Sequence, residues 1–263
     1  MRTVQFEFLR PGEILAEKER VSLAYLPVGP LEWHGPALPY GTDGLWAQEI
    51  ARAAAQITGG VVMPTVFIGT ERERPAYILK AKGFEDAEKQ YIVGMDVPAN
   101  PMKSLYARED IFALIIREHL RLLVQQGYKL IVVVNGHGAW GQKDTLQRLA
   151  VEFTNETKSK VIATMPEVFA ADEDYDEGHG TLVETSMLRG IFDEHVDLSQ
   201  FPPREIPLKY TDYGIADDFV FSGKASPDNC VVYDPRDATV ELGRKFFNHA
   251  VQTLVETVRE EMP

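Results

Sequence analysis

The 263-residue chain contains one cysteine, Cys230, and no long apolar run. A single cysteine excludes an intramolecular disulfide bond and a zinc site built from several thiolates. No segment approaches the roughly 20 consecutive apolar residues that cross a bilayer, so we expect no membrane-spanning helix. The first ten residues carry no apolar stretch behind a basic start, and we therefore expect no secretion signal and a cytoplasmic location.

Basic residues are also scarce. The chain has 27 Lys and Arg against 40 Asp and Glu, which gives a formal net charge of -13. Because nucleic-acid surfaces need clustered Lys and Arg to contact phosphates, a nucleic-acid partner is not expected. Hydrophobic residues make up 44% of the chain, the proportion of an ordinary globular protein, and they recur from end to end. We therefore expect a soluble protein that acts on a small molecule.

Short apolar strands alternate with amphipathic helices along most of the chain. The clearest strand, at 129–134 (KLIVVV), is a continuous run typical of a central parallel strand covered on both faces. Other strands are expected at 21–28, 61–68 and 160–165, and helices at 44–57, 110–126, 142–156, 181–192 and 237–262. This alternation predicts a single α/β domain over residues 1–263 with a mostly parallel sheet.

The segment 71–108 fits this pattern poorly. It is rich in charge, aromatic residues, glycine and proline, and it is too long for a routine connection. Long irregular segments in compact enzymes often form lids or substrate-binding loops, and a partly helical insertion that forms an oligomer contact is the other interpretation. Its cations either contact a polar substrate or form a solvated face: Arg72, Arg74, Lys80, Lys82, Lys103 and Arg108.

Polar side chains follow three of the predicted strands, at the edge where parallel sheets bind ligands. Glu32 and His34 come after the first strand, and their alternate spacing in an extended segment would point both side chains the same way. Asp43 follows at a helix start, where it could bridge two ions. Imidazole and carboxylate ligands together suit zinc, manganese or iron(II). Four more candidates follow the strands at 129–134 and 160–165: His137, Glu177, His179 and Glu184.

Two of these residues also have ordinary structural interpretations. Asp43 is placed to cap the helix that follows it, a common role for aspartate at this position. A single histidine such as His34 is more often a hydrogen-bonded structural residue than a metal ligand. A Glu-x-His pair alone is therefore a weak signal, and it gains weight only with His137 at a second strand end.

A dinucleotide fingerprint is the sharper alternative. The pattern Gly136-x-Gly138-x-x-Gly141 follows a strand and opens a helix, which would make the chain an NAD-dependent oxidoreductase. The fingerprint usually belongs to the first strand–helix unit, whereas here it falls in mid-chain. Trp140 would crowd the pyrophosphate, and the fingerprint leaves the cluster at 32–43 unexplained.

The residues at 27–43, PVGPLEWHGPALPYGTD, resemble the creatininase (creatinine amidohydrolase) family, whose pattern is close to P-x-G-x-x-E-x-H-G-x-x-L-P-x-x-T-D. A second family motif, N-G-H-G, stands at 135–138, and a third is similar to HGTLVETS at 179–186. The sequence DPRDAT at 234–239 resembles the family's C-terminal end. The resemblance spans most of the chain except 71–108, and it implies a three-layer α/β/α sandwich and a homohexamer built as a trimer of dimers.

The resemblance also implies a metal site. Two divalent ions (zinc, manganese or iron) would be held by four side chains, with the aspartate bridging them: Glu32, His34, Asp43 and His137. Creatininase takes a further ligand two residues after the histidine of N-G-H, but that position is Ala139 here, which cannot bind a metal. Glu184 is the natural substitute, and its alternative role is a capping box with Thr181.

The same resemblance assigns the chemistry. His179 matches the family's catalytic histidine, a proton donor to the leaving group, and Glu177 is placed to orient it. Trp33 and Trp140 flank two ligands, where they either wall the substrate pocket or belong to the core. The expected reaction is hydrolysis of a small polar molecule, a cyclic amide or other C–N bond, by a metal-bound hydroxide.

Other substrates remain open. Opening of a cyclic keto-inositol or a lactone ring is the alternative reaction that the resemblance allows. Creatinine itself is not expected, because creatininase places tryptophans over creatinine shortly before the third motif. Residues 141–263 of this chain contain no tryptophan.

Overall fold

The structure is a computed structural model that describes residues 3–81, 84, 86–96, 100, 102–173, 175, 178–206, 208 and 233–262. Cys230 and Glu177, which the sequence analysis singled out, lie outside these residues. No helix in the described part of the chain is long and apolar enough to cross a membrane.

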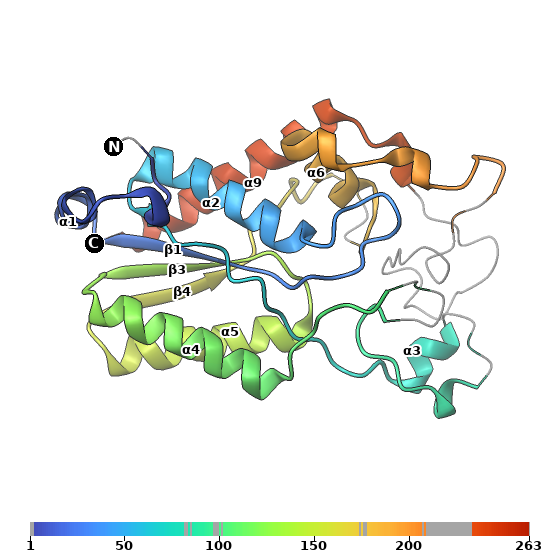
Figure 1. Ribbon diagram of the computed structural model, residues 1–263, viewed down its shortest axis with the longest axis horizontal. Coiled ribbons are helices and arrows are strands. Elements are labelled where there is room, and N and C mark those ends of the chain that lie inside the picture. Colours follow the sequence, from blue (N-terminus) through green and yellow to red (C-terminus); the bar gives the residue numbers. More distant parts are fainter. Residues whose placement is uncertain are drawn as a thin grey trace.

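A four-stranded sheet lies at the centre of the molecule (Figure 1). The strand order is β2-β1-β3-β4, and every pair is parallel. The strands are β1 at Leu23–Val28, β2 at Val61–Val62, β3 at Leu130–Asn135 and β4 at Lys160–Thr164. β1 and β3 are buried along their whole lengths, as the continuous apolar run KLIVVV predicts for a strand covered on both faces.

Helices cover both faces of this sheet. In Figure 1, α2 (Thr42–Thr58), α6 (Leu182–Phe192) and α9 (Val240–Glu261) lie on one side, and α4 (Glu109–Gln125) and α5 (Trp140–Glu156) lie on the other. Alternate residues of the strands point to opposite faces of the sheet and belong to two separate hydrophobic cores. Tyr25 and Val132 pack with the first group of helices, whereas Leu26 and Val133 pack with the second. The expected three-layer α/β/α sandwich is confirmed.

Three details differ from the sequence-based expectations. β2 does not extend over 61–68. Met63 N–H donates to the Tyr25 carbonyl, but the next β1 residue on this side is Pro27, which has no N–H to donate back, and Val66 forms only an isolated bridge to Val28. α2 begins at Thr42 with Gly41 as its N-cap, so Asp43 lies inside the first turn and the interpretation of Asp43 as the cap is wrong. The helix α1 (Pro11–Arg20) is not among those predicted.

The unusual segment 71–108 is partly helical. It contains α3 (Ala76–Ala81) and a short 3-10 helix at Ala87–Lys89, and Glu73 pairs with Val93 in an antiparallel bridge. Leu79, Ala87 and Ile92 form a small apolar cluster of its own. Its C-terminal end then runs beside the loop that follows β1, since Leu105 N–H donates to the carbonyl of Leu31 at 2.8 Å. This contact brings the segment to the carboxyl edge of the sheet.

Candidate metal centre

The candidate ligands meet at the carboxyl ends of β1 and β3. Glu32 and His34 lie in the loop after β1, and His137 lies in the loop after β3. Asp43 points toward them from the first turn of α2, and Glu184 from the first turn of α6. Because parallel strands end at one edge, residues more than a hundred positions apart in the sequence converge on one buried spot.

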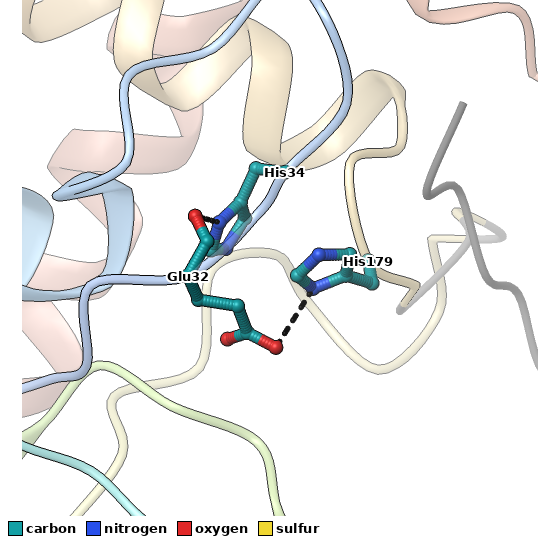
Figure 2. Close-up of side chains that lie close together, drawn as sticks. All are labelled: Glu32, His34 and His179. Carbon is teal, nitrogen blue, oxygen red and sulfur yellow. Dashed lines mark hydrogen bonds and ion pairs between the residues drawn. The ribbon is translucent and has the colours of Figure 1, made fainter. Parts of the chain in front are cut away.

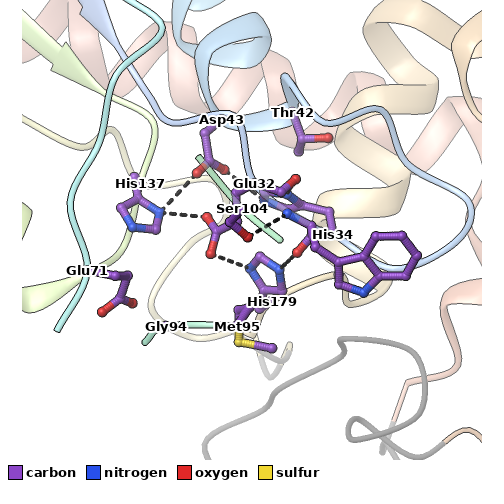
Figure 3. A network of polar contacts seen from close by, with 12 residues as sticks. Glu32, His34, Thr42, Asp43, Glu71, Gly94, Met95, Ser104, His137 and His179 are labelled. Atoms are coloured by element: carbon purple, nitrogen blue, oxygen red, sulfur yellow. Dashed lines mark hydrogen bonds and ion pairs between the residues drawn. The ribbon is translucent and has the colours of Figure 1, made fainter. Parts of the chain in front are cut away.

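One group consists of Glu32, Asp43 and His137 (Figure 3). His137 Nδ1 lies 3.0 Å from Glu32 Oε2 and 2.9 Å from Asp43 Oδ2. Both of these carboxylate oxygens are buried and have no hydrogen-bond partner. Two buried carboxylate oxygens converging on one imidazole nitrogen need a positive charge between them, which a proton on His137 or a divalent cation would supply.

The second group consists of His34, Asp43 and Glu184. His34 Nδ1 lies 3.1 Å from the carbonyl oxygen of Glu32, a contact drawn in Figure 2. Because a carbonyl only accepts, Nδ1 carries a proton, and Nε2 is the nitrogen that would bind a metal once it has lost its own proton. Nε2 lies 2.9 Å from Asp43 Oδ1 and 3.9 Å from Glu184 Oε2. The two groups therefore share Asp43, one through each of its oxygens, as a bridging ligand requires.

Protons on the two ligand histidines offset the buried carboxylates in this arrangement. Burial lowers the pKa of His34, but Asp43 and Glu184 outweigh burial and raise that pKa to about 10. For His137, burial again opposes the proton, whereas Glu32 and Asp43 raise the pKa well above its ordinary value. The pKa of Asp43 falls below its usual range despite burial, because both histidines favour its charged form. A bound divalent cation would take over the role of these protons.

Glu184 accepts a hydrogen bond from the backbone before α6 and also faces the candidate ligands. Its Oε2 accepts a hydrogen bond from the Gly180 N–H at 2.5 Å, which satisfies a donor just before the helix. The capping box would instead require the N–H of Thr181, the N-cap residue. The same carboxylate also belongs to the group with His34 and Asp43. Burial raises the pKa of Glu184 to about 7, and His34 only partly opposes this.

His179 lies beside both groups, in the loop between β4 and α6. Its Nε2 donates to the carbonyl of Trp33, and its Nδ1 lies 3.8 Å from Glu32 Oε1. The ring centroid is 4.1 Å from that of His34. Burial and the nearby His34 lower the pKa of His179 to about 3, so the ring is neutral near pH 7. Glu32, His34 and His179 also form a third group that could hold a metal (Figure 2).

The two tryptophans differ in position. Trp33 lies between Glu32 and His34, its ring packs edge-on to Tyr40, and its buried Nε1 has no hydrogen-bond partner. Trp140 is 75% exposed at the start of α5, with the Lys143 ammonium 4.8 Å from its ring. The structure therefore places Trp33 at the candidate site and leaves Trp140 on the surface of the chain.

The cations of segment 71–108 are engaged by nearby acceptors. Arg72 lies 3.4 Å from Glu109, Lys103 donates to the carbonyl of Asp96, and Arg108 lies 2.7 Å from Asp110. Arg74 and Lys80 likewise pair with acids of the segment, Glu71 and Glu88. Lys82 lies outside the described residues. This pairing favours the interpretation as a charged face over a set of substrate-binding cations.

Comparison with known proteins decides the family. The family model described as creatinine amidohydrolase matches residues 9–81 and 95–258. This chain belongs to the creatininase family. The unmatched residues between 81 and 95 lie within the segment 71–108, which did not fit the alternation of strands and helices in the sequence. Among curated proteins, none matched the sequence.

Solved structures of this family share the fold. A crystal structure of creatinine amidohydrolase (creatininase) covers 100% of this chain and 99% of its own, with 19% identity and a TM-score of 0.70. The structure "Creatininase Mn" is 20% identical over 99% of each chain, with a TM-score of 0.69. A putative creatinine amidohydrolase from Bacteroides fragilis NCTC 9343 is 20% identical, covering 99% of this chain and 96% of its own, with a TM-score of 0.67.

Packing around the N-G-H-G loop explains why residue 136, which also belongs to the possible dinucleotide fingerprint, is a glycine. A Cβ at Gly136 would lie 2.0 Å from the carbonyl oxygen of Asp43, whereas a Cβ at Gly138 would meet nothing within 4 Å. Gly136 thus lets the end of β3 approach the backbone of Asp43 in α2. Membership of the creatininase family leaves the oxidoreductase alternative without support.

Two residues missed by the sequence analysis hold this loop. Asn135 donates to the carbonyl of His137 at 2.7 Å, and its Oδ1 accepts from the His137 N–H and from Gln142. Gln142 is fully buried and also accepts from the Thr70 N–H. Asn135 stands in the N-G-H-G motif, which could have indicated its role, whereas nothing in the local pattern marks Gln142.

Replacing Gly136 with alanine should displace Asp43 and weaken the site. Because the new methyl group would overlap backbone atoms rather than a flexible side chain, we expect a loss of about 1–3 kcal/mol in unfolding free energy. Bound metal per subunit should fall at the same time. Thermal melts and metal analysis measure both effects. Gly138→Ala, in the same motif with open space at its Cβ, is the matched control, and equal behaviour of the two variants would contradict this account.

Proposed function

We propose that this creatininase-family protein is a two-metal hydrolase of a small polar molecule, cleaving a cyclic amide or another C–N bond. The placement of Asp43 supports this most strongly. One of its oxygens faces His34 and the other faces His137, and a second carboxylate accompanies each histidine. An Asp that only stabilised the protein would not require two imidazoles and two further acids around it in a buried site.

The donor set suits two divalent ions. Glu32 and His137 would hold one ion and His34 and Glu184 the other, with Asp43 bridging. These nitrogen and oxygen ligands accept zinc, manganese or iron(II). Among the solved relatives, one is described with manganese and a mutant creatininase is described as the Zn-Zn type. Bound here, the ions would polarise a carbonyl group and lower the pKa of water.

His179 supplies the proton chemistry in this proposal. Its Nε2–H donates to the Trp33 carbonyl, which fixes the tautomer and leaves the lone pair of Nδ1 facing the carboxylate of Glu32. The ring is neutral near pH 7, so the lone pair of Nδ1 is free to take a proton from the attacking water. The same Nδ1 then delivers that proton to the departing nitrogen, which leaves poorly as an anion. One histidine thus serves as base and then as acid.

A substrate screen tests this function. Purified protein loaded with zinc or manganese should hydrolyse one class among lactams, formamides, lactones and cyclic polyol ketones. Turnover of a lactone or a cyclic keto-inositol would favour the alternative ring-opening reaction. Glu32→Gln should abolish the activity found, and His119→Gln, on α4, is the control. Absence of bound divalent ions in protein purified without chelator, with activity unchanged in Glu32→Gln, would refute the hydrolase proposal.

Metal binding should release protons. His34, with its pKa of about 10, and His137, with its pKa well above the ordinary value, each carry a proton at pH 7 and must lose it to bind a metal. Glu184, whose pKa burial raises to about 7, would add to this release. We therefore expect release of about two to three protons per subunit, and affinity that rises with pH. Titration calorimetry in buffers of different ionisation enthalpy measures this number, and zero release would contradict it.

Assembly into a homohexamer remains a proposal. Exposed apolar side chains on the outer face of α4 are compatible with a subunit contact: Ile111, Leu114 and Leu122. Sedimentation velocity of the full chain measures the assembly state. We also propose a cytoplasmic location, which fractionation of cells producing the protein would test.

A further inference from the structure

Tyr106 reaches the candidate metal centre from the segment 71–108. Its hydroxyl donates a hydrogen bond to Glu32 Oε1, and its ring lies beside that of His137, with centroids 6.3 Å apart. The Glu32 side chain is almost fully buried, at 1% exposure. A hydrogen bond to an ionised carboxylate is among the stronger kinds, and burial strengthens it further. Tyr106 therefore contacts the candidate ligand directly.

The hydroxyl distinguishes the two oxygens of Glu32. Oε1 accepts from Tyr106, whereas Oε2 has no hydrogen-bond partner and lies 3.0 Å from His137 Nδ1 (Figure 3). Only Oε2 is thus left facing Asp43 and His137. A carboxylate held in this way presents one oxygen, in a fixed direction, to an ion.

The backbone around Tyr106 is fixed to the ligand loop. Ser104 Oγ accepts from the Trp33 N–H at 3.2 Å, and the Leu105 N–H donates to the Leu31 carbonyl. The Tyr106 oxygen also accepts from the Met95 N–H at 3.2 Å. Gly94 leaves room for this ring, because a Cβ there would lie 2.7 Å from it. These contacts position the hydroxyl from several sides.

We propose that Tyr106 is a positioning residue for Glu32, which directs Oε2 alone toward the ion bound with Asp43 and His137. This inference rests on the proposed two-metal function and extends it. Residues that orient a metal ligand typically contribute 10–100-fold in metal affinity. The segment 71–108 would then be a structural part of the metal centre through its last residues, rather than only a lid over it.

The test is the variant Tyr106→Phe, which removes one oxygen atom. Zn²⁺ titrated in competition with a chromophoric chelator should show one of the two sites weakened by about 10–100-fold, with the other little changed. Tyr91→Phe, in the same segment with its side chain 76% exposed, is the matched control. Circular dichroism and thermal melts establish that both variants are folded.

If Tyr106→Phe also lowers the stability of the protein, the double variant Tyr106→Phe/Glu32→Gln provides a second test. When Tyr106 acts through Glu32, Tyr106→Phe should add little to the loss of Zn²⁺ affinity in Glu32→Gln. Additive losses would overturn the proposal. So would an unchanged Zn²⁺ affinity in Tyr106→Phe, including the case in which turnover falls, because the hydroxyl would then act on the substrate. A wild-type protein that binds no Zn²⁺ would instead refute the proposed function itself.

Discussion

Replacing Asp43 with asparagine should abolish tight binding of both divalent ions and lower kcat/KM by at least about a thousandfold. Each oxygen of Asp43 faces a different histidine, so loss of the carboxylate charge affects both ions at once. Metal-assisted activation contributes several kcal/mol to such reactions, and each 1.36 kcal/mol corresponds to tenfold in rate. Metal analysis after gel filtration and kinetics on the substrate found by screening measure the two effects.

Asp110→Asn is the matched control for this variant. Both aspartates lie in the first turn of a 17-residue helix, so both substitutions remove a favourable charge from a helix N-terminus. Asp110 is exposed and pairs with Arg108 outside the site. Its replacement should leave metal content and turnover unchanged. If Asp43→Asn retained two ions per subunit, the bridging role would be wrong.

Replacing His179 with glutamine should lower kcat by about 10²–10⁴-fold while leaving metal content unchanged. The glutamine amide can still donate to the Trp33 carbonyl, but it cannot accept and release a proton near neutral pH. The pH dependence of kcat should lose the limb that reports this group. Single-turnover kinetics across pH, with parallel metal analysis, measure the effect.

The metal analysis also separates two roles for His179. Its ring nitrogen belongs to a group with Glu32 and His34 that could hold an ion. If His179→Gln lost metal in step with activity, the histidine would be a ligand and the acid–base assignment would be wrong. His195→Gln, at an exposed position in the 3-10 helix after α6, is the control and should behave as the wild type.

Much of the fold could be predicted because its signals are local and strong. The run KLIVVV predicts a strand buried on both faces, and β3 is that strand. Gly127 predicts the end of the preceding helix, and α4 ends at Gln125 with Gly127 at a φ of +83°. The extent of β2 was overestimated, because the apolar run continues over 61–68 whereas the ladder to β1 ends where Pro27 has no N–H to donate.

The candidate site was predictable where a motif marks it. The fixed spacing at 27–43 and the N-G-H-G at 135–138 single out four residues that the fold brings together: Glu32, His34, Asp43 and His137. Tyr106 carries no such mark, since its role depends on where a distant loop passes. Local sequence also could not tell whether a side chain caps a helix: Asp43 lies one residue inside α2, and Glu184 accepts from Gly180 rather than from Thr181.

The proposed ligands are spread along the chain from Glu32 to Glu184, and this spacing would set when the protein can acquire metal during synthesis. A nascent chain that ends before α6 lacks Glu184, and one that ends before β3 also lacks His137. Neither possesses a complete set of donors. Metal loading at the proposed centre would therefore wait until the sheet and its helices have assembled, and a folded protein rather than a flexible peptide would select the ion.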